Sequence, residues 1–81
     1  MLISVEISYY PLKEEFKAPI LKFIDELNLN KNIIVKTNTM ATQVFGEFDE
    51  VMGTVTNCIK NAFELPHSVF VMKVINADLR S

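Results

Sequence analysis

The sequence predicts an α+β domain in which a four-stranded antiparallel sheet carries two helices on one face. Residues 2–10 alternate apolar and polar side chains, which is the period of a half-buried strand. Two later segments place apolar residues three or four positions apart, which is the period of an amphipathic helix. Short β-prone runs complete the order strand, helix, strand, strand, helix, strand, over residues 2–10, 17–29, 33–36, 40–45, 48–63 and 68–75.

The chain has 81 residues and no shift in composition along its length, so we expect one domain spanning residues 1–81. A domain of this size buries only roughly 60% of the surface that its unfolded chain exposes. Its stability is therefore expected to be small unless a second copy of the chain covers more of its apolar area.

Charged residues are nearly balanced, with 8 basic and 10 acidic residues and a net charge of −2. Without a basic face to neutralise phosphates, nucleic acid is not an expected partner. Cys58 is the only cysteine, which excludes an internal disulfide and a cysteine-based metal cluster within one chain, and fits a reducing cytoplasm. Glu6 interrupts the N-terminal apolar run, and no run reaches the about 18 apolar residues of a membrane span. We expect a soluble cytoplasmic protein without a signal peptide.

The first strand should divide its side chains between the two faces of the sheet, and Pro11 should end its pairing. The row expected to face the helices is apolar, and the row on the opposite face is polar, free for solvent or a partner. The first row is Ile3, Val5, Ile7 and Tyr9, and the second is Ser4, Glu6, Ser8 and Tyr10.

The first helix is expected to begin near Lys17 or Ala18, because Pro19 is tolerated only in the first turn. Asparagines at 28, 30 and 32 mark its end, since asparagine accepts the left-handed conformation that reverses a chain. The next two runs are joined by Thr37-Asn38-Thr39, which suggests a hairpin or bend, and Gly46 closes the second run. The polar side chains of residues 37–43 suit either turn chemistry or ligand recognition, whereas Met40 and Met52 are expected to fill the core.

The second helix, 48–63, has the longest apolar stripe, with acidic residues in its first turn and Pro66 beyond its end. The last strand, 68–75, is apolar on both faces apart from Lys73, so we expect a second subunit to cover it. Residues 76–81 read as a polar tail. With right-handed crossovers, this order of elements is the split βαβ, or ferredoxin-like, arrangement.

Enzymatic signals are weak, and we expect neither catalysis, nor a metal, nor a cofactor. His67 lies in a short connection, and Cys58 falls on the apolar stripe of the second helix, where a buried inert thiol is expected. An RNA-recognition module shares this topology, but its basic residue, glycine and spaced aromatics do not match residues 40–46. Glu6, within a strand, is either solvated or is an acid that is paired or faces a ligand. The aromatic residues at 9, 10, 45 and 48 could form the core or stack on a heterocycle.

Three segments together resemble the YkoF-like family of thiamine and hydroxymethylpyrimidine binding proteins: Ile7-Ser-Tyr-Tyr-Pro-Leu12, Lys36-Thr-Asn-Thr-Met-Ala-Thr-Gln-Val-Phe-Gly46 and Phe48-Asp-Glu-Val-Met52. The resemblance covers nearly the whole chain. It implies a ferredoxin-like fold and non-catalytic binding of thiamine or its pyrimidine moiety, linked to thiamine uptake or salvage. Some members of the family carry two such domains in tandem, so it also implies that two copies of this chain associate, as a dimer or tetramer. Ala41 departs from the family pattern, which often has a Ser-Thr pair here.

An aminopyrimidine has an amine donor and ring-nitrogen acceptors, which Asn38, Thr42 and Glu6 could satisfy, and a thiazolium cation could lie on the face of Tyr10. The predicted ligand-binding residues are Glu6, Ser8, Tyr10, Thr37, Asn38 and Thr42. The sequence has no positive cluster for a pyrophosphate, so we expect unphosphorylated thiamine to be preferred to its diphosphate. The alternative reading is a protein-interaction or regulatory module that uses the open sheet face and binds no small molecule.

Overall fold

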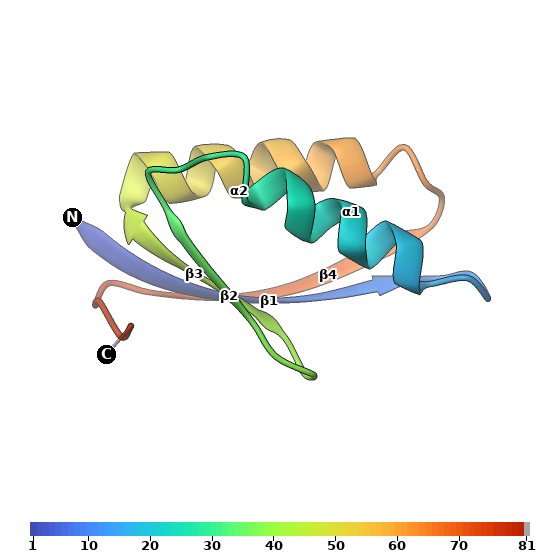
Figure 1. Ribbon diagram of the computed structural model, residues 1–81, viewed down its shortest axis with the longest axis horizontal. Coiled ribbons are helices and arrows are strands. Elements are labelled where there is room, and N and C mark those ends of the chain that lie inside the picture. The colour runs from blue at the N-terminus through green and yellow to red at the C-terminus, as the bar shows by residue number, and fades with distance from the viewer. Residues whose placement is uncertain (81) are drawn as a thin grey trace.

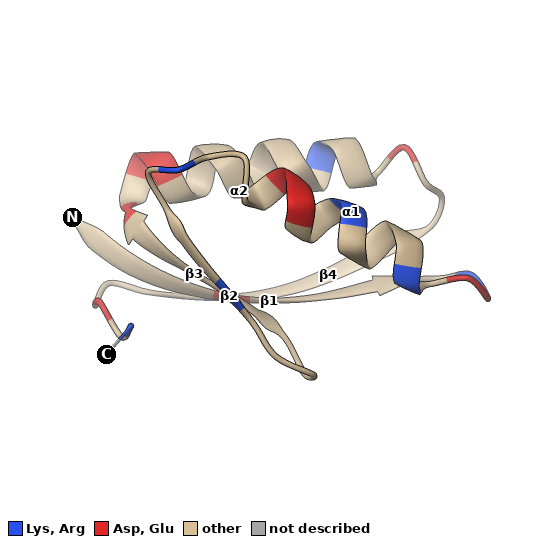
Figure 2. Ribbon diagram, in the orientation of Figure 1, with Lys and Arg blue, Asp and Glu red and all other residues tan. Residues whose placement is uncertain are grey.

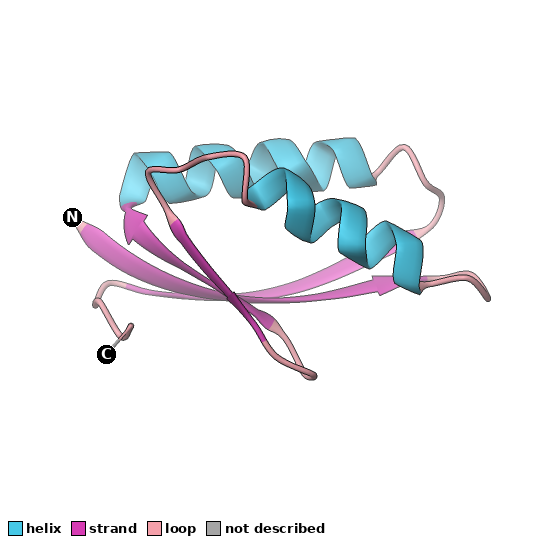
Figure 3. Ribbon diagram, viewed as in Figure 1, coloured by secondary structure: helices cyan, strands magenta, loops and turns pink. Residues whose placement is uncertain are grey.

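The computed structural model describes residues 1–80 and confirms the predicted α+β, ferredoxin-like fold (Figure 1). The sheet is antiparallel, with the strand order β2-β3-β1-β4, and both helices pack on one of its faces (Figure 3). The elements are β1 (Leu2–Pro11), α1 (Lys17–Leu27), β2 (Ile34–Thr37), β3 (Thr42–Glu47), α2 (Phe48–Ala62) and β4 (Ser68–Ile75).

Strand β1 lies in the middle of the sheet, and its register assigns every neighbouring side chain to a face. Val5 is paired with Val44 of β3 and Val74 of β4, and Glu6 is paired with Gln43 and Lys73. Since residues directly opposite one another point to the same face, the predicted alternation of β1 is confirmed. The core under the helices consists of Ile3, Val5, Ile7, Phe23, Leu27, Ile33, Val44, Val51, Val55 and Cys58.

Helix α1 begins at Lys17, with Pro19 in its first turn as predicted, and ends at Leu27, two residues earlier than expected. The asparagines after it do not adopt the predicted left-handed conformation, because no described residue except Gly46 has a positive φ. Their side chains make hydrogen bonds instead. Asn28 Nδ2 donates to the Ile24 carbonyl at 3.0 Å, Asn30 Nδ2 to Thr54 Oγ1 at 2.7 Å and Asn32 Nδ2 to Glu50 Oε1 at 2.8 Å. The last two bonds hold the connection to β2 against α2.

The strands of the β2–β3 hairpin have the predicted lengths but begin one and two residues later than predicted, because turn chemistry takes residues 38–41. Asn38 Oδ1 accepts hydrogen bonds from the backbone N–H groups of Met40, at 2.8 Å, and Ala41, at 3.0 Å. The Asn38 N–H donates to the Ala41 carbonyl at 3.1 Å and closes the turn. The predicted core position of Met40 is wrong: this side chain lies on the loop and is 85% exposed.

Helix α2 follows β3 directly, and Gly46 makes this possible. Glu47 is the N-cap, and its Oε1 accepts a hydrogen bond from the Asp49 N–H at 3.0 Å. Gly46 has a φ of +154°, and a Cβ atom there would lie 3.2 Å from Cγ2 of Val51, which is fully buried. Both the backbone conformation and the space therefore favour glycine.

We expect Gly46→Ala to destabilise the protein by about 1–2 kcal/mol, through backbone strain and the contact with Val51. Gly53→Ala is the matched control. Gly53 lies within α2, and a Cβ atom there would meet no atom within 4 Å, so this change should stabilise the protein by about 0.5–1 kcal/mol. Urea denaturation of both variants checks the signs. Equal free energies of unfolding would contradict this account of the β3–α2 junction.

The C-terminal segment, residues 76–80, folds back across the sheet face that the helices leave uncovered. Ser4 Oγ donates to the Ala77 carbonyl at 2.6 Å and accepts from the Leu79 N–H at 2.9 Å. Lys36 Nζ donates to the Arg80 carbonyl at 3.0 Å. Ser4 is consequently buried, so the prediction of an uncovered polar row is wrong at this position, because the segment read as a polar tail packs on it. Position 81 of that predicted tail lies outside the described residues.

Ser4→Ala should release this segment, since it leaves the Ala77 carbonyl and the Leu79 N–H without their partner. We expect a loss of about 1–2 kcal/mol of stability and faster hydrogen exchange at the Leu79 amide. Ser8→Ala is the control, because the Ser8 hydroxyl makes no hydrogen bond within residues 1–80. Unchanged exchange at Leu79 in Ser4→Ala would show that Ser4 does not hold the segment.

Basic and acidic positions are interspersed along the ribbon (Figure 2). Across residues 1–80, no helix has both the length and the apolar character required to cross a membrane.

Candidate functional site

A groove of about 290 Å³ separates helix α1 from the β2–β3 hairpin and the end of β1, and we call it the hairpin groove. Its α1 side is apolar and is formed by Phe16, Ile20, Phe23 and Ile24. The strand and loop side supplies the polar groups. These belong to Ser8, Tyr9, Tyr10, Asn38, Thr39 and Thr42, and Ile7, Met40 and Ala41 complete the lining.

The groove exists because β1 is longer than its partner β3. The pairing of these strands ends at Ile7 and Thr42, whereas β1 continues to Pro11, paired there with β4 alone. Residues 8–11 therefore have no neighbouring strand on the hairpin side. A strand edge of this kind presents free backbone N–H and C=O groups, which can bind the polar edge of a ligand.

Thr42 is the most distinctive polar residue of the hairpin groove. It lies opposite Ile7, on the helix-facing side of the sheet, and is only 8% exposed. Its hydroxyl makes no hydrogen bond to any residue in the range 1–80. No buried side-chain oxygen in that range lacks a partner, so this hydroxyl is accessible from the groove and can bind a ligand there.

Asn38 combines the two roles that the sequence left open. Its Oδ1 atom is used by the turn, where it accepts from two backbone N–H groups. Its Nδ2 atom makes no hydrogen bond with the described part of the chain and remains a donor. Oδ1 therefore stabilises the turn, whereas Nδ2 is free to donate a hydrogen bond to a ligand.

Two aromatic side chains of the groove are accessible. Tyr10 is 52% exposed and extends from the end of β1, and Phe16 precedes α1 and is 49% exposed. Phe16 is not among the ligand-binding residues that the sequence predicts. Its place in the groove could not be read from helical periodicity, because Phe16 lies outside the helix.

The structure separates two of the six predicted ligand-binding residues from the other four. Glu6 lies on the opposite sheet face, where its carboxylate pairs with Lys73 Nζ at 3.5 Å beside a second groove of about 270 Å³. That groove is bounded by the C-terminal segment at Leu79. Thr37 is exposed and lies outside the hairpin groove, although it is paired with Thr42. Ser8, Tyr10, Asn38 and Thr42 all line the hairpin groove. Ser8 and Tyr10 border it from the unpaired end of β1, although they belong to the same row of side chains as Glu6.

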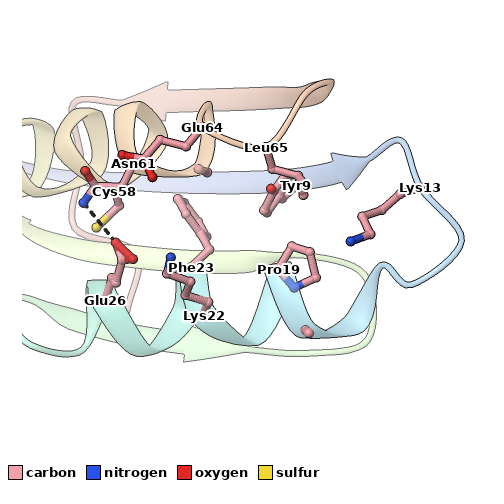
Figure 4. Close-up of a pocket in the computed structure, with 12 residues that line it drawn as sticks. Tyr9, Lys13, Pro19, Lys22, Phe23, Glu26, Cys58, Asn61, Glu64 and Leu65 are labelled. Atoms are coloured by element: carbon pink, nitrogen blue, oxygen red, sulfur yellow. Dashed lines mark hydrogen bonds between the residues drawn. The ribbon is translucent and has the colours of Figure 1, made fainter.

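A third groove, of about 340 Å³, lies between α1 and α2, and we call it the interhelix groove (Figure 4). Tyr9 and Phe23 line it, and Glu26 Oε2 accepts a hydrogen bond from Asn61 Nδ2 at 3.1 Å across it. Cys58 also lines it. Burial, and secondarily the Glu26 carboxylate, raises the pKa of this thiol above its usual value of 9.0. Such a thiol stays protonated at neutral pH, as expected for an inert cysteine.

The residues of the interhelix groove were not recognised in the sequence, since they come from three separated elements and carry no motif. Within residues 1–80, no group of three histidine, cysteine, aspartate or glutamate side chains could hold a metal ion.

Comparison with known proteins relates this chain to others by fold. No protein-family model matches the chain, and no curated protein matches its sequence. A structural-genomics target from Streptococcus pneumoniae has a TM-score of 0.88 at 21% identity, covering 100% of this chain and 92% of that one. A domain of unknown function from Bacillus cereus, of the DUF77 type, has a TM-score of 0.72 at 12% identity, covering 98% and 79%.

A third solved structure is that of a Thermotoga maritima protein, provisionally described as a thiamine biosynthesis or salvage protein. It has a TM-score of 0.83 at 19% identity, covering 95% of this chain and 85% of that one. At identities this low, the TM-scores establish a common fold and nothing more. A thiamine-related protein is thus among the structural neighbours of this chain.

Proposed function

We propose that the hairpin groove binds thiamine or its hydroxymethylpyrimidine moiety without catalysis, and that the protein serves thiamine uptake or salvage as a YkoF-like binding protein. The observation that carries this proposal is that one groove is lined by Ser8, Tyr10, Asn38 and Thr42. These residues come from separate parts of the chain. The thiamine-related structural neighbour supports the same ligand class.

The polar groups of the groove complement an aminopyrimidine. Thr42 supplies a hydroxyl and Asn38 an amide N–H, both suited to ring nitrogens. The free edge of β1 at residues 8–11 supplies carbonyls for the exocyclic amine, the role that the sequence interpretation gave to Glu6. Tyr10 and Phe16 offer aromatic faces for a thiazolium cation. The volume of about 290 Å³ is close to the lower end of the roughly 300–1,000 Å³ that ligand pockets span.

The lining of the hairpin groove also indicates whether a phosphorylated ligand should bind there. It includes no lysine or arginine from the described part of the chain. A diphosphate would therefore have no cation to pair with there, so unphosphorylated thiamine should bind more tightly than its diphosphate.

Calorimetry and thermal melting with thiamine, hydroxymethylpyrimidine and thiamine diphosphate test the proposal. A ligand at about 100 times its dissociation constant should add about 2.7 kcal/mol to the stability. In a domain of this size such a gain raises the melting temperature by on the order of 10 °C. Equal or tighter binding of the diphosphate would contradict the assignment of the phosphate-free form. No shift with any of the three would favour an assembly module that binds no small molecule.

We also propose that a second copy of the chain covers β4. This strand lies at the edge of the sheet, and apolar side chains on both of its faces are exposed. Long apolar edge strands of this kind favour pairing with another chain. The exposed apolar residues are Val69, Val71, Met72, Val74 and Ile75.

Val71→Lys should weaken this association. Val71 lies opposite Ser8 on the face away from the helices and is 54% exposed, so the monomer should tolerate the lysine. We expect sedimentation to show a shift toward monomer, because the interface would have to bury an unpaired charge. Asn57→Lys, on the exposed side of α2, is the control and should leave the assembly unchanged. A wild-type chain that is monomeric at all concentrations would refute the proposed pairing.

A further inference from the structure

The interhelix groove arises where both helices present small side chains to each other. Ala18 and Pro19 lie on the α1 side, and Cys58 and Ala62 on the α2 side. Larger residues at these positions would interlock and fill the space, as they do in most helix pairs. The result is a groove of about 340 Å³ with Phe23 and Tyr9 among its walls, larger than the hairpin groove (Figure 4).

The charged groups of this groove are arranged along its length. Lys13 lies near Pro19 at one end, Glu26 lies with Asn61 and Cys58 at the other, and Lys22 lies between them (Figure 4). A second carboxylate, that of Glu64, lines the groove just beyond the end of α2. Neither lysine forms an ion pair with any residue in the range 1–80, although Lys22 lies one turn from Glu26. The Glu26 carboxylate is already hydrogen-bonded to Asn61.

We propose that the interhelix groove is a second ligand site, which binds an apolar monocarboxylate with its carboxylate at Lys13 and Lys22. The apolar body of the ligand would lie along Phe23 and Tyr9, between the small residues of the two helices. The lysines supply charge-assisted hydrogen bonds to the carboxylate. A dicarboxylate is disfavoured, because its second charge would approach Glu26 or Glu64. The two grooves share Tyr9 and Phe23 in their walls, but the charged groups of this site do not line the hairpin groove, and the proposal does not depend on the ligand proposed there.

At the end of the groove away from Lys13, the wall is suited to contact with the uncharged body of the ligand. Cys58 is buried there as a protonated thiol, which behaves as a small apolar side chain. Its position also provides a reporter. An occupied groove should slow the alkylation of this single cysteine by a thiol reagent.

Octanoate, used below the concentration at which it forms micelles, is the probe for calorimetry and for protection of Cys58. We expect saturable binding, and binding of 1-octanol that is at least about tenfold weaker, because the alcohol lacks the charge. Lys13→Gln and Lys22→Gln together should weaken octanoate binding by a similar factor. Lys60→Gln, on the exposed side of α2, is the matched control and should not change it.

Ala62→Leu should abolish octanoate binding by filling the groove, whereas Thr42→Val, in the hairpin groove, should leave it unchanged. The lysine variants are decisive if Ala62→Leu fails to fold, because both lysines are exposed. The proposal is overturned if octanoate does not bind, if octanol binds equally well, or if Lys60→Gln weakens binding as much as the double variant does. Failure of thiamine to bind would leave these results unaffected.

Discussion

Phe23→Ala is expected to destabilise the protein by about 3–5 kcal/mol. Phe23 is only 3% exposed and lies at the centre of an aromatic cluster, with its ring centroid 5.6 Å from that of Tyr9 and 5.1 Å from that of Phe70. It is also one of only two buried residues of α1, the other being Leu27. Removing the ring leaves a cavity between α1 and the sheet. Because domains are stable by only about 5–15 kcal/mol, and one this small is expected near the lower end, this variant should lose most of its stability.

Urea denaturation and near-ultraviolet circular dichroism measure this effect. Phe16→Ala is the matched control, because it removes the same side chain from a half-exposed position and should change the stability by less than about 1 kcal/mol. A Phe23→Ala variant as stable as Phe16→Ala would contradict the assignment of Phe23 to the core.

Thr42→Val should weaken thiamine or hydroxymethylpyrimidine binding while leaving the protein as stable as before, or more stable. Valine has the same shape, and the Thr42 hydroxyl makes no hydrogen bond within the described chain that the change could remove. Its partner in the complex would be left unpaired, which costs about 1–2 kcal/mol, or roughly 5- to 30-fold in affinity. Opposite effects on binding and stability distinguish a ligand-binding residue from a structural one.

Thr37→Val provides the control for this experiment. Thr37 is the cross-strand partner of Thr42 and carries the same hydroxyl, but it lies outside the hairpin groove. Its replacement should not change the affinity measured by calorimetry. If the two variants bind equally well, Thr42 does not contact the ligand.

Most of the fold was predictable from the sequence, because it depends on local periodicity. The alternation along β1 identified which side chains face the helices, and the position of Pro19 fixed the start of α1. The apolar stripe that begins at Phe48 located α2. In each case one face of an element is buried, so the spacing of the apolar residues along the sequence indicates which face that is.

The composition of the candidate site depended on register, which periodicity does not reveal. Glu6 and Thr42 both lie within strands and were expected to serve one ligand. In the structure Thr42 is paired with Ile7, the neighbour of Glu6, so the two side chains point to opposite faces of the sheet. A shift of one residue in pairing would have reversed this outcome.

Contacts between segments that are distant in the chain could not be predicted from the sequence either. The burial of Ser4 depends on Ala77 and Leu79, which are more than 70 residues away in the chain. Likewise, the interhelix groove depends on small residues that face one another only after the helices have packed. Neither feature leaves a local pattern, because each is produced by tertiary packing.

Amide chemical-shift mapping during titration with thiamine and hydroxymethylpyrimidine tests the central claim most directly, since it distinguishes the three grooves in one experiment. We predict the largest saturable shifts at residues 8–10 and 38–42, which line the hairpin groove. The absence of saturable shifts would contradict the claim. So would shifts centred on Lys73 and Leu79 of the opposite sheet face, or on Cys58 and Asn61 of the interhelix groove.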